Sequence, residues 1–238
     1  ACSGVIAAVL IGSTGSKALG ISAALAAGAM VGLVNGFVIA KLRINALITT
    51  LATMQIVRGL GFIICRGIPQ PIMLPALGEA TPMGVPTPVW IAAGSFLVFG
   101  LLLNRTVFGR NALAIGGNRE AARLAGIPVV RTKIVIFTLQ GIMAAFTGIV
   151  VAAKMQLAHP RPLEGFSLNV ISACVLGGVS LSGGVGTIMG AIVGVLIMGT
   201  VENAMELCRV EYFYKYVIRG AILLAAVLFD QLKQRRTT

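Results

Sequence analysis

Neutral hydrogen-bonding side chains lie inside stretches of this sequence that are otherwise apolar. They are threonine, serine, glutamine and asparagine, with one arginine among them: Thr49, Thr50, Thr53, Gln55, Arg58, Asn169, Ser172 and Asn203. Apart from the arginine, these groups donate and accept hydrogen bonds without adding charge. They suit a neutral polyhydroxylated solute better than an ion, so we expect them to line a path for such a solute.

A structural role is the alternative for the three threonines, because a helical threonine commonly bonds to the carbonyl four residues earlier. Arg58 differs, because a charged group inside an apolar span is costly unless it faces a partner or water. We therefore expect Arg58 to have an interior partner.

Catalytic chemistry finds little support. The segment Gly12–Lys17, GSTGSK, lacks both the spacing of a P-loop and the hydroxyl residue after its lysine. His159 is the single histidine, which excludes an HExxH zinc site. The cysteines lack a CxxC spacing, which favours buried structural thiols over a disulfide framework or a metal site: Cys2, Cys65, Cys174 and Cys208. We expect a transport protein that is not an enzyme and has no cofactor or ATPase site of its own.

A stand-alone secondary carrier or channel is the alternative transport protein. A proton-coupled carrier would be expected to expose an Asp, Glu or His within the membrane. Glu202, close to the end of an apolar stretch, is the only candidate.

The composition places the chain in a bilayer. Apolar residues make up 57% and charged residues 11%, whereas a soluble domain has about 25% charged residues. The net charge of +12 does not indicate a nucleic-acid partner, because the basic residues lie mainly between apolar runs, as the positive-inside rule describes. We expect membrane lipid, and no nucleic acid, around the chain.

The apolar runs predict an all-α, polytopic transmembrane bundle of about eight membrane segments that forms one domain over residues 1–238. A span needs about 20 residues, so the first run is incomplete, and we expect it to end a longer helix in a chain that is truncated at its N-terminus. The prolines concentrated between residues 67 and 88 predict a loop without helix. The segments are 1–11, 18–40, 44–65, 89–104, 134–153, two within 166–202 joined by a glycine turn at 176–186, and 214–230.

Glycines recur every four residues in two of these segments. The repeats are Gly28, Gly32 and Gly36, and then Gly186, Gly190 and Gly194. This spacing puts the glycines on one helix face and predicts close contact with a neighbouring helix.

A polar, basic island, Phe108–Lys133, interrupts the apolar pattern within a predicted water-exposed loop at 105–133. Alternating the spans puts this island, the turn at 41–43 and the basic tail at 231–238 on the side that holds more lysine and arginine. By the positive-inside rule that side is the cytoplasm, so we expect a cytoplasmic C-terminus. We expect a structured loop of this kind to be a docking surface through which another protein moves this one.

The island contains Glu120, Ala121, Ala122 and Gly126, which resemble the EAA-type cytoplasmic loop of permease subunits in bacterial ABC importers. Four strings together resemble the monosaccharide importers of the ribose, xylose and arabinose group: INALITTLATMQIVRGL (44–60), FGRNALAIGGNREAARLAGIPV (108–129), VISACVLGGVSLSGGVG (170–186) and GTVENAM (199–205). The resemblance runs nearly from end to end. The four strings are specific in combination, whereas the EAA pattern alone is weak.

The resemblance implies a permease in the bacterial inner membrane that imports a pentose such as L-arabinose. It implies that Glu120, Ala121, Ala122 and Gly126 form a short helix that docks into a separate ATPase subunit. It also implies a permease homodimer and a periplasmic sugar-binding protein. From the resemblance we expect family members to carry further membrane segments before the point where this sequence begins, and we expect a longer loop, less rich in proline, than the one at 67–88, where a binding protein would dock.

Overall fold

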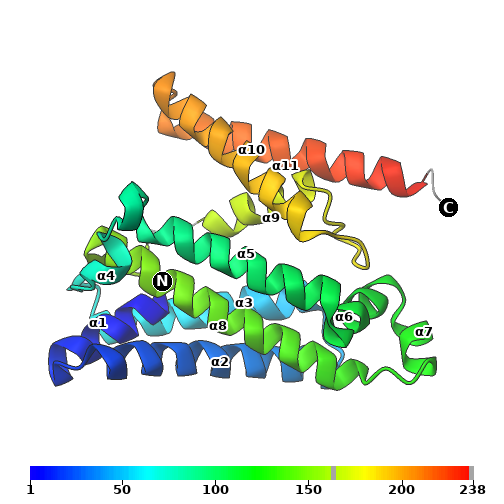
Figure 1. Cartoon of the computed structure of the whole chain (residues 1–238), viewed down its shortest axis with the longest axis horizontal. Coiled ribbons are helices and arrows are strands. Elements are labelled where there is room, and N and C mark those ends of the chain that lie inside the picture. Colours follow the sequence, from blue (N-terminus) through cyan, green and yellow to red (C-terminus); the bar gives the residue numbers. More distant parts are fainter. Residues whose placement is uncertain (162–164, 236–238) are drawn as a thin grey trace. The chain divides into compact units, whose positions relative to one another are not determined.

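A computed structural model describes residues 1–161 and 165–235, and over these residues the regular secondary structure is helical apart from one pair of two-residue strands (Figure 1). The expected all-α class is confirmed. The last three residues of the predicted tail, 236–238, lie outside the described residues. The elements, in chain order, are α1 (Cys2–Thr14), α2 (Lys17–Lys41), α3 (Ala46–Cys65), β1 (Gln70–Pro71), α4 (Pro75–Gly78), the 3₁₀ helix η1 (Pro82–Gly84), α5 (Thr87–Arg105), α6 (Val107–Gly117), α7 (Arg119–Leu124), α8 (Val129–Met155), β2 (Leu157–Ala158), α9 (Phe166–Leu176), α10 (Ile188–Leu207) and α11 (Tyr212–Arg235).

Five of these helices are long and apolar enough to cross a membrane: α2, α3, α5, α8 and α10. Helices α1 and α9 are apolar but shorter, with 13 and 11 residues. Each predicted membrane segment coincides with a helix, although the ends differ. Helix α1 continues to Thr14 rather than stopping at residue 11, and α8 begins at Val129, so the end of the predicted island is helical.

The chain divides into two compact units, which are described separately. The first comprises Ala1–Gly94 and Pro128–Glu164, and the second comprises Ser95–Ile127 and Gly165–Thr238. The first unit therefore holds α1 to α4 and α8, and the second holds α6, α7 and α9 to α11. Helix α5 begins in the first unit and ends in the second.

Glycines on α2 allow the closest helix contact in the first unit. A Cβ atom added at Gly28 would meet Ala145 and the Gly141 carbonyl of α8, and one added at Gly32 would meet the Phe137 carbonyl. At Gly36 it would lie 2.8 Å from the Ile134 Cα atom. The predicted role of this first glycine repeat is confirmed, because the backbone of α8 occupies the space that side chains would need.

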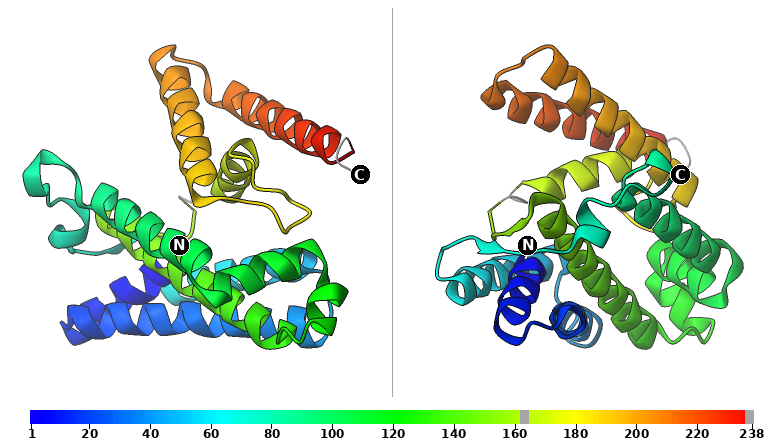
Figure 2. Two further views of the ribbon diagram at one scale, coloured as in Figure 1. Left: turned by 45° about the vertical axis from the view of Figure 1, so that its right-hand side comes forward. Right: turned by 60° about the vertical axis from the view of Figure 1, so that its left-hand side comes forward.

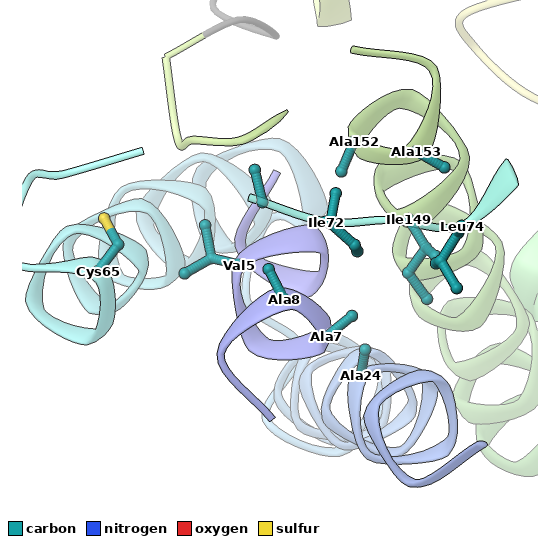
Figure 3. Packing of buried hydrophobic residues seen from close by; sticks show 11 residues of the cluster. Val5, Ala7, Ala8, Ala24, Cys65, Ile72, Leu74, Ile149, Ala152 and Ala153 are labelled. Carbon is teal, nitrogen blue, oxygen red and sulfur yellow. The ribbon is translucent and has the colours of Figure 1, made fainter. Parts of the chain in front are cut away.

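The core of the first unit combines α1, α2 and α8 with the proline-rich segment. Figure 3 shows Val5 of α1, Ile149 of α8 and Ile72 from this segment in one cluster. Ile72 is 1% exposed. Next to it, β1 pairs antiparallel with β2, with Gln70 opposite Ala158. The segment before α5 and the segment after α8 therefore lie side by side.

The prediction that residues 67–88 contain no helix is wrong at two places. Helix α4 begins with Pro75 and η1 begins with Pro82, each at the first helical position. Proline is tolerated there because the missing N–H would have no intrahelical partner in any case. A Cβ atom at Gly78, at the end of α4, would meet the Ala153 carbonyl of α8, so α4 is held against that helix.

In the second unit, α9 packs against both α10 and α11, and the chain turns back after α10 to form α11 (orange to red, Figure 2). Added Cβ atoms at Gly177 and Gly194 would meet the carbonyls of Gly190 and Ala173, so the backbones of α9 and α10 are in contact. The second predicted glycine repeat is therefore confirmed at Gly190 and Gly194. It is wrong at Gly186, which precedes α10 and whose added Cβ would contact the side chain of Val179.

Candidate functional site

The polar side chains predicted on α3 form most of their hydrogen bonds within that helix. The hydroxyls of Thr49, Thr50 and Thr53 each donate to the carbonyl four residues earlier, at 2.9 Å in every case. The structural alternative for the threonines is thus confirmed. Each hydroxyl oxygen still has acceptor capacity, because its single hydrogen is used and its lone pairs remain.

One of these threonines also joins two helices. The Thr53 hydroxyl lies 2.6 Å from the Asn35 side-chain oxygen on α2, and it shares its hydrogen between this oxygen and the Thr49 carbonyl. Both residues are half-buried. Asn35 is therefore part of the polar group on α3, although it comes from the preceding helix.

Arg58 lies one turn from Gln55 on α3. Its Nη1 atom donates to the Gln55 Oε1 atom at 3.4 Å, and the arginine is half-buried whereas the glutamine is exposed. Because Gln55 is exposed, this bond is a surface contact within α3 and is not the interior partner that was expected.

A second polar group lies in the second unit, around Glu202 of α10. The Glu202 Oε1 atom accepts from the Asn169 Nδ2 atom of α9 at 2.8 Å and pairs with the Arg219 Nη2 atom of α11 at 3.0 Å. The side chains of Arg219 and Glu202 are 29% and 33% exposed. Within the described part of the chain, the Arg219 Nε atom is buried without a hydrogen-bond partner. Glu202 thus connects α9, α10 and α11.

The other two candidates in this unit are not part of that group. Ser172 is 1% exposed and donates to the Leu168 carbonyl of its own helix at 2.8 Å. Asn203 follows Glu202 on α10 and is exposed. The structure therefore brings Asn169 to Glu202, whereas Ser172 has a helix-internal bond and Asn203 is exposed.

Sequence reasoning missed Arg219, but the sequence carried a signal for it. Glu202 and Glu206 are spaced i,i+4 on α10, and Lys215 and Arg219 have the same spacing on α11, directly after a short turn. Residues four apart share a helix face, so the two acidic residues match the two basic ones. In the structure Lys215 Nζ lies 3.8 Å from Glu206 Oε1, which completes a second pair, in which the lysine side chain is 19% exposed and the glutamate 72%.

The island of polar residues forms two helices, α6 and α7. Asn118 lies between them, and its Oδ1 atom accepts from the backbone N–H groups of Glu120 and Ala121, both at 3.0 Å. This is an N-cap, which satisfies donors that have no partner within the helix. The short helix implied by the resemblance is present as α7, and α6 is a helix that the sequence analysis did not predict.

Helix α7 ends before Gly126. This glycine has a φ of 80°, a conformation that favours glycine, and the Ile127 N–H donates to the Ala122 carbonyl at 3.1 Å. Ala122 is 4% exposed, whereas Leu124 is 86% exposed. The helix thus has one buried residue and presents a large apolar side chain on its outer surface.

The cysteines and the histidine have ordinary structural positions. Cys65 is buried, as predicted, but Cys208 is exposed, so the prediction of buried thiols is wrong for it. His159 accepts from the Arg161 N–H at 3.2 Å and contacts the Phe62 ring edge-on. It is therefore a turn residue.

Charge-neutral substitutions test whether the Glu202–Arg219 pair stabilises the second unit. We expect the Glu202→Gln, Arg219→Gln double variant to be destabilised by less than the sum of the two single variants, with a coupling of about 1 kcal/mol or more. The reason is that each single change leaves a half-buried charge without its partner. Unfolding in mixed detergent micelles measures the cycle.

The Glu206–Lys215 pair is the matched control for this cycle because it joins the same two helices. Glu206 is 72% exposed, and exposed pairs contribute only about 0–1 kcal/mol. Equal coupling energies for the two pairs would contradict a special role for Glu202.

Comparison with known proteins identifies the family of the chain. The family described as branched-chain amino acid transport system / permease component matches residues 1–227. The L-arabinose transport system permease protein of Escherichia coli (strain K12) is 58% identical over 238 residues, which are 99% of this chain and 73% of that protein. The L-arabinose ABC transporter permease protein of Azospirillum brasilense is 53% identical over 241 residues, covering 99% and 70% of the two chains.

A ribose relative is more distant. The ribose import permease protein of Escherichia coli (strain K12) is 38% identical over 241 residues, covering 98% of this chain and 75% of that protein. No solved structure matches the chain. Permease components lack the ATPase domain, in agreement with the expectation of a transport subunit. The chain therefore belongs to this family of ABC transporter permease components and is a multi-pass membrane protein.

Proposed function

We propose that this chain is the membrane-spanning subunit of an importer that carries L-arabinose into the bacterial cytoplasm, with energy from a separate ATPase subunit. The observation that carries the proposal is the 58% identity, over 99% of the chain, to a permease of an L-arabinose transport system. The identity to a ribose permease is lower, at 38% over a similar length. The partners in this proposal are an ABC ATPase subunit, a periplasmic sugar-binding protein and a second copy of the permease.

The proposed topology has α6, α7 and the C-terminus in the cytoplasm, within the bacterial inner membrane. Two contacts support the alternation of spans on which it depends. The β1–β2 pair joins the segment before α5 to the segment after α8, as expected if both lie outside. The end of α6 contacts the turn between α9 and α10 at Gly184, as expected if both lie inside.

Helix α7 is proposed to dock on the ATPase subunit through Glu120, Ala121, Ala122 and Gly126. Leu124 is 86% exposed, so its side chain is accessible for contact with a partner protein. Gly126 contributes by ending the helix, so that the chain turns directly into α8. Ala122 is buried, so its role in the proposal is to hold α7 in place.

The solute path is proposed to include Thr49, Thr50, Thr53, Gln55, Arg58, Asn169, Ser172 and Asn203, within one transmembrane domain over 1–238. The threonine hydroxyls keep lone pairs that can accept from a sugar hydroxyl, and Gln55 and Asn203 are exposed on their helices. Ser172 has the weakest support, because its side chain is buried and already bonded.

Reconstitution tests the proposed function directly. Proteoliposomes that contain the permease, the ATPase subunit and the sugar-binding protein are expected to accumulate L-arabinose when ATP is supplied on the cytoplasmic face, and to accumulate D-ribose more slowly. Uptake is measured with labelled sugar. Sugar flux through the permease alone would contradict the proposal and favour a stand-alone carrier or channel.

In the same system, Leu124→Asp tests the docking role of α7. We expect the binding free energy of the ATPase subunit to weaken by about 2 kcal/mol or more, which is the size of an interface hot spot. Sugar uptake is expected to fall to background. The reason is that the change places a charge at an apolar contact. Co-purification of the two subunits measures the binding.

Leu124→Met is the matched control, because it keeps an apolar side chain of similar size. We expect it to bind the ATPase subunit and transport normally. If Leu124→Asp inserts into the membrane and still binds the ATPase as the wild type does, α7 is not the docking helix.

A further inference from the structure

The end of α6 is in backbone contact with the turn between α9 and α10. A Cβ atom added at Gly116 would lie 2.5 Å from the Gly184 N atom. Conversely, one added at Gly184 would lie 2.6 Å from the Gly117 Cα atom, and one added at Gly183 would lie 2.8 Å from the Gly116 carbonyl oxygen. No side chain separates the two backbones, so only glycine fits on each side of this contact.

The turn that receives this contact is held by its own hydrogen bonds. Ser180 N–H donates to the Val185 carbonyl at 2.9 Å, and Gly183 N–H donates to the Ser180 carbonyl at 3.2 Å. Gly183 and Gly184 have φ values of 91° and 76°, which glycine adopts without strain. Because these hydrogen bonds fix the shape of the turn, a displacement of one of its residues displaces the whole turn.

On the other side of the contact, a single residue joins α6 to α7. The Asn118 N–H donates to the Ala114 carbonyl at the end of α6 at 3.0 Å, and the Asn118 side chain caps α7. The two helices also pack against each other. No flexible linker lies between them, so a displacement of α7 is passed to the last turn of α6, where Gly116 lies.

Beyond the turn, the backbone at the end of α9 is in contact with the first half of α10. Gly177 lies against the Gly190 carbonyl, and Gly194 lies against the Ala173 carbonyl. Farther from the turn, Asn169 is bonded to Glu202. The two helices are therefore linked at successive levels, and a push on the turn between them displaces both.

We propose that the contact of Gly116 with Gly184 is the positioning contact through which movement of α7 reaches α9 and α10. The proposal rests on the proposed function, in which the ATPase subunit moves α7. Close-packed atoms resist further approach steeply, so a contact between two backbones passes on a displacement that flexible side chains would absorb. Gly116 and Gly184 touch neither solute nor ATP in this account and act only by position.

The adjacent glycines of α6 provide a matched test. Gly116→Ala places a methyl group 2.5 Å from the Gly184 N atom, whereas the same group at Gly117 lies 3.9 Å from the Gly184 Cα atom, an ordinary contact. We expect Gly116→Ala to bind the ATPase subunit and hydrolyse ATP at the basal rate, but to lose sugar-stimulated ATPase activity and uptake by about tenfold or more, within the range of coupling factors between linked sites. Gly117→Ala is expected to transport normally.

A second pair separates the contact from backbone strain. Gly178 and Gly184 have similar φ values of 82° and 76°, but an added Cβ atom at Gly178 meets nothing within 4 Å. Gly178→Ala and Gly184→Ala therefore carry a similar conformational cost, and only Gly184→Ala disturbs α6. Loss of coupling in Gly184→Ala alone supports the proposal, and equal loss in both variants overturns it.

The wild-type complex gives a readout that needs no folded variant. Amide hydrogen exchange of residues 177–187 is expected to change when ATP binds to the ATPase subunit, in parallel with exchange in α7. A change in α7 without any change at 177–187 overturns the proposal.

The outcomes also distinguish this proposal from the proposed function. If Leu124→Asp abolishes ATPase binding while Gly116→Ala transports as the wild type does, the docking helix is correct and the route through Gly116 is wrong. If Leu124→Asp also binds and transports normally, the docking itself is wrong.

Discussion

Close approach between backbones is the physical constraint on which this structure depends. In a bilayer, lipid is as apolar as the helix surfaces, so helices associate through close packing and polar contacts rather than through exclusion of water. The glycines of α2 bring it against α8, and those of α10 bring it against α9. Such contacts hold the paired helices at a short, fixed distance, because no side chain separates their backbones.

Polar groups inside the membrane helices follow from the same constraint. A hydroxyl or a charge without a partner is costly there, and the structure satisfies most of them locally. The three threonines of α3 bond to their own helix, while Glu202 bonds to Asn169 and Arg219 on two neighbouring helices. The first arrangement leaves oxygens that can still accept a bond from a solute, whereas the second joins α9, α10 and α11.

The helical spans could be predicted from the sequence because length and hydropathy determine them, and the glycine repeat of α2 because its period matches the helix. The pair Glu202–Arg219 was not predicted, because it depends on a turn that brings two charged helix faces together. The helical starts at Pro75 and Pro82 were missed because proline was treated only as a helix breaker. The contact of Gly116 with Gly184 could not be predicted, because neither glycine belongs to a repeat that reveals the other.

The proposed roles of the candidate residues require that α7 faces the cytoplasm and that the proline-rich segment faces outward. Site-directed cysteine labelling in intact cells measures this sidedness most directly, in a chain carrying Cys208→Ser because Cys208 is itself exposed. Leu124 and Met73 are 86% and 78% exposed, so cysteines at these positions are accessible to reagent. We predict that a membrane-impermeant maleimide labels Met73→Cys and leaves Leu124→Cys unlabelled until the membrane is opened. Labelling of Leu124→Cys in intact cells would contradict the account.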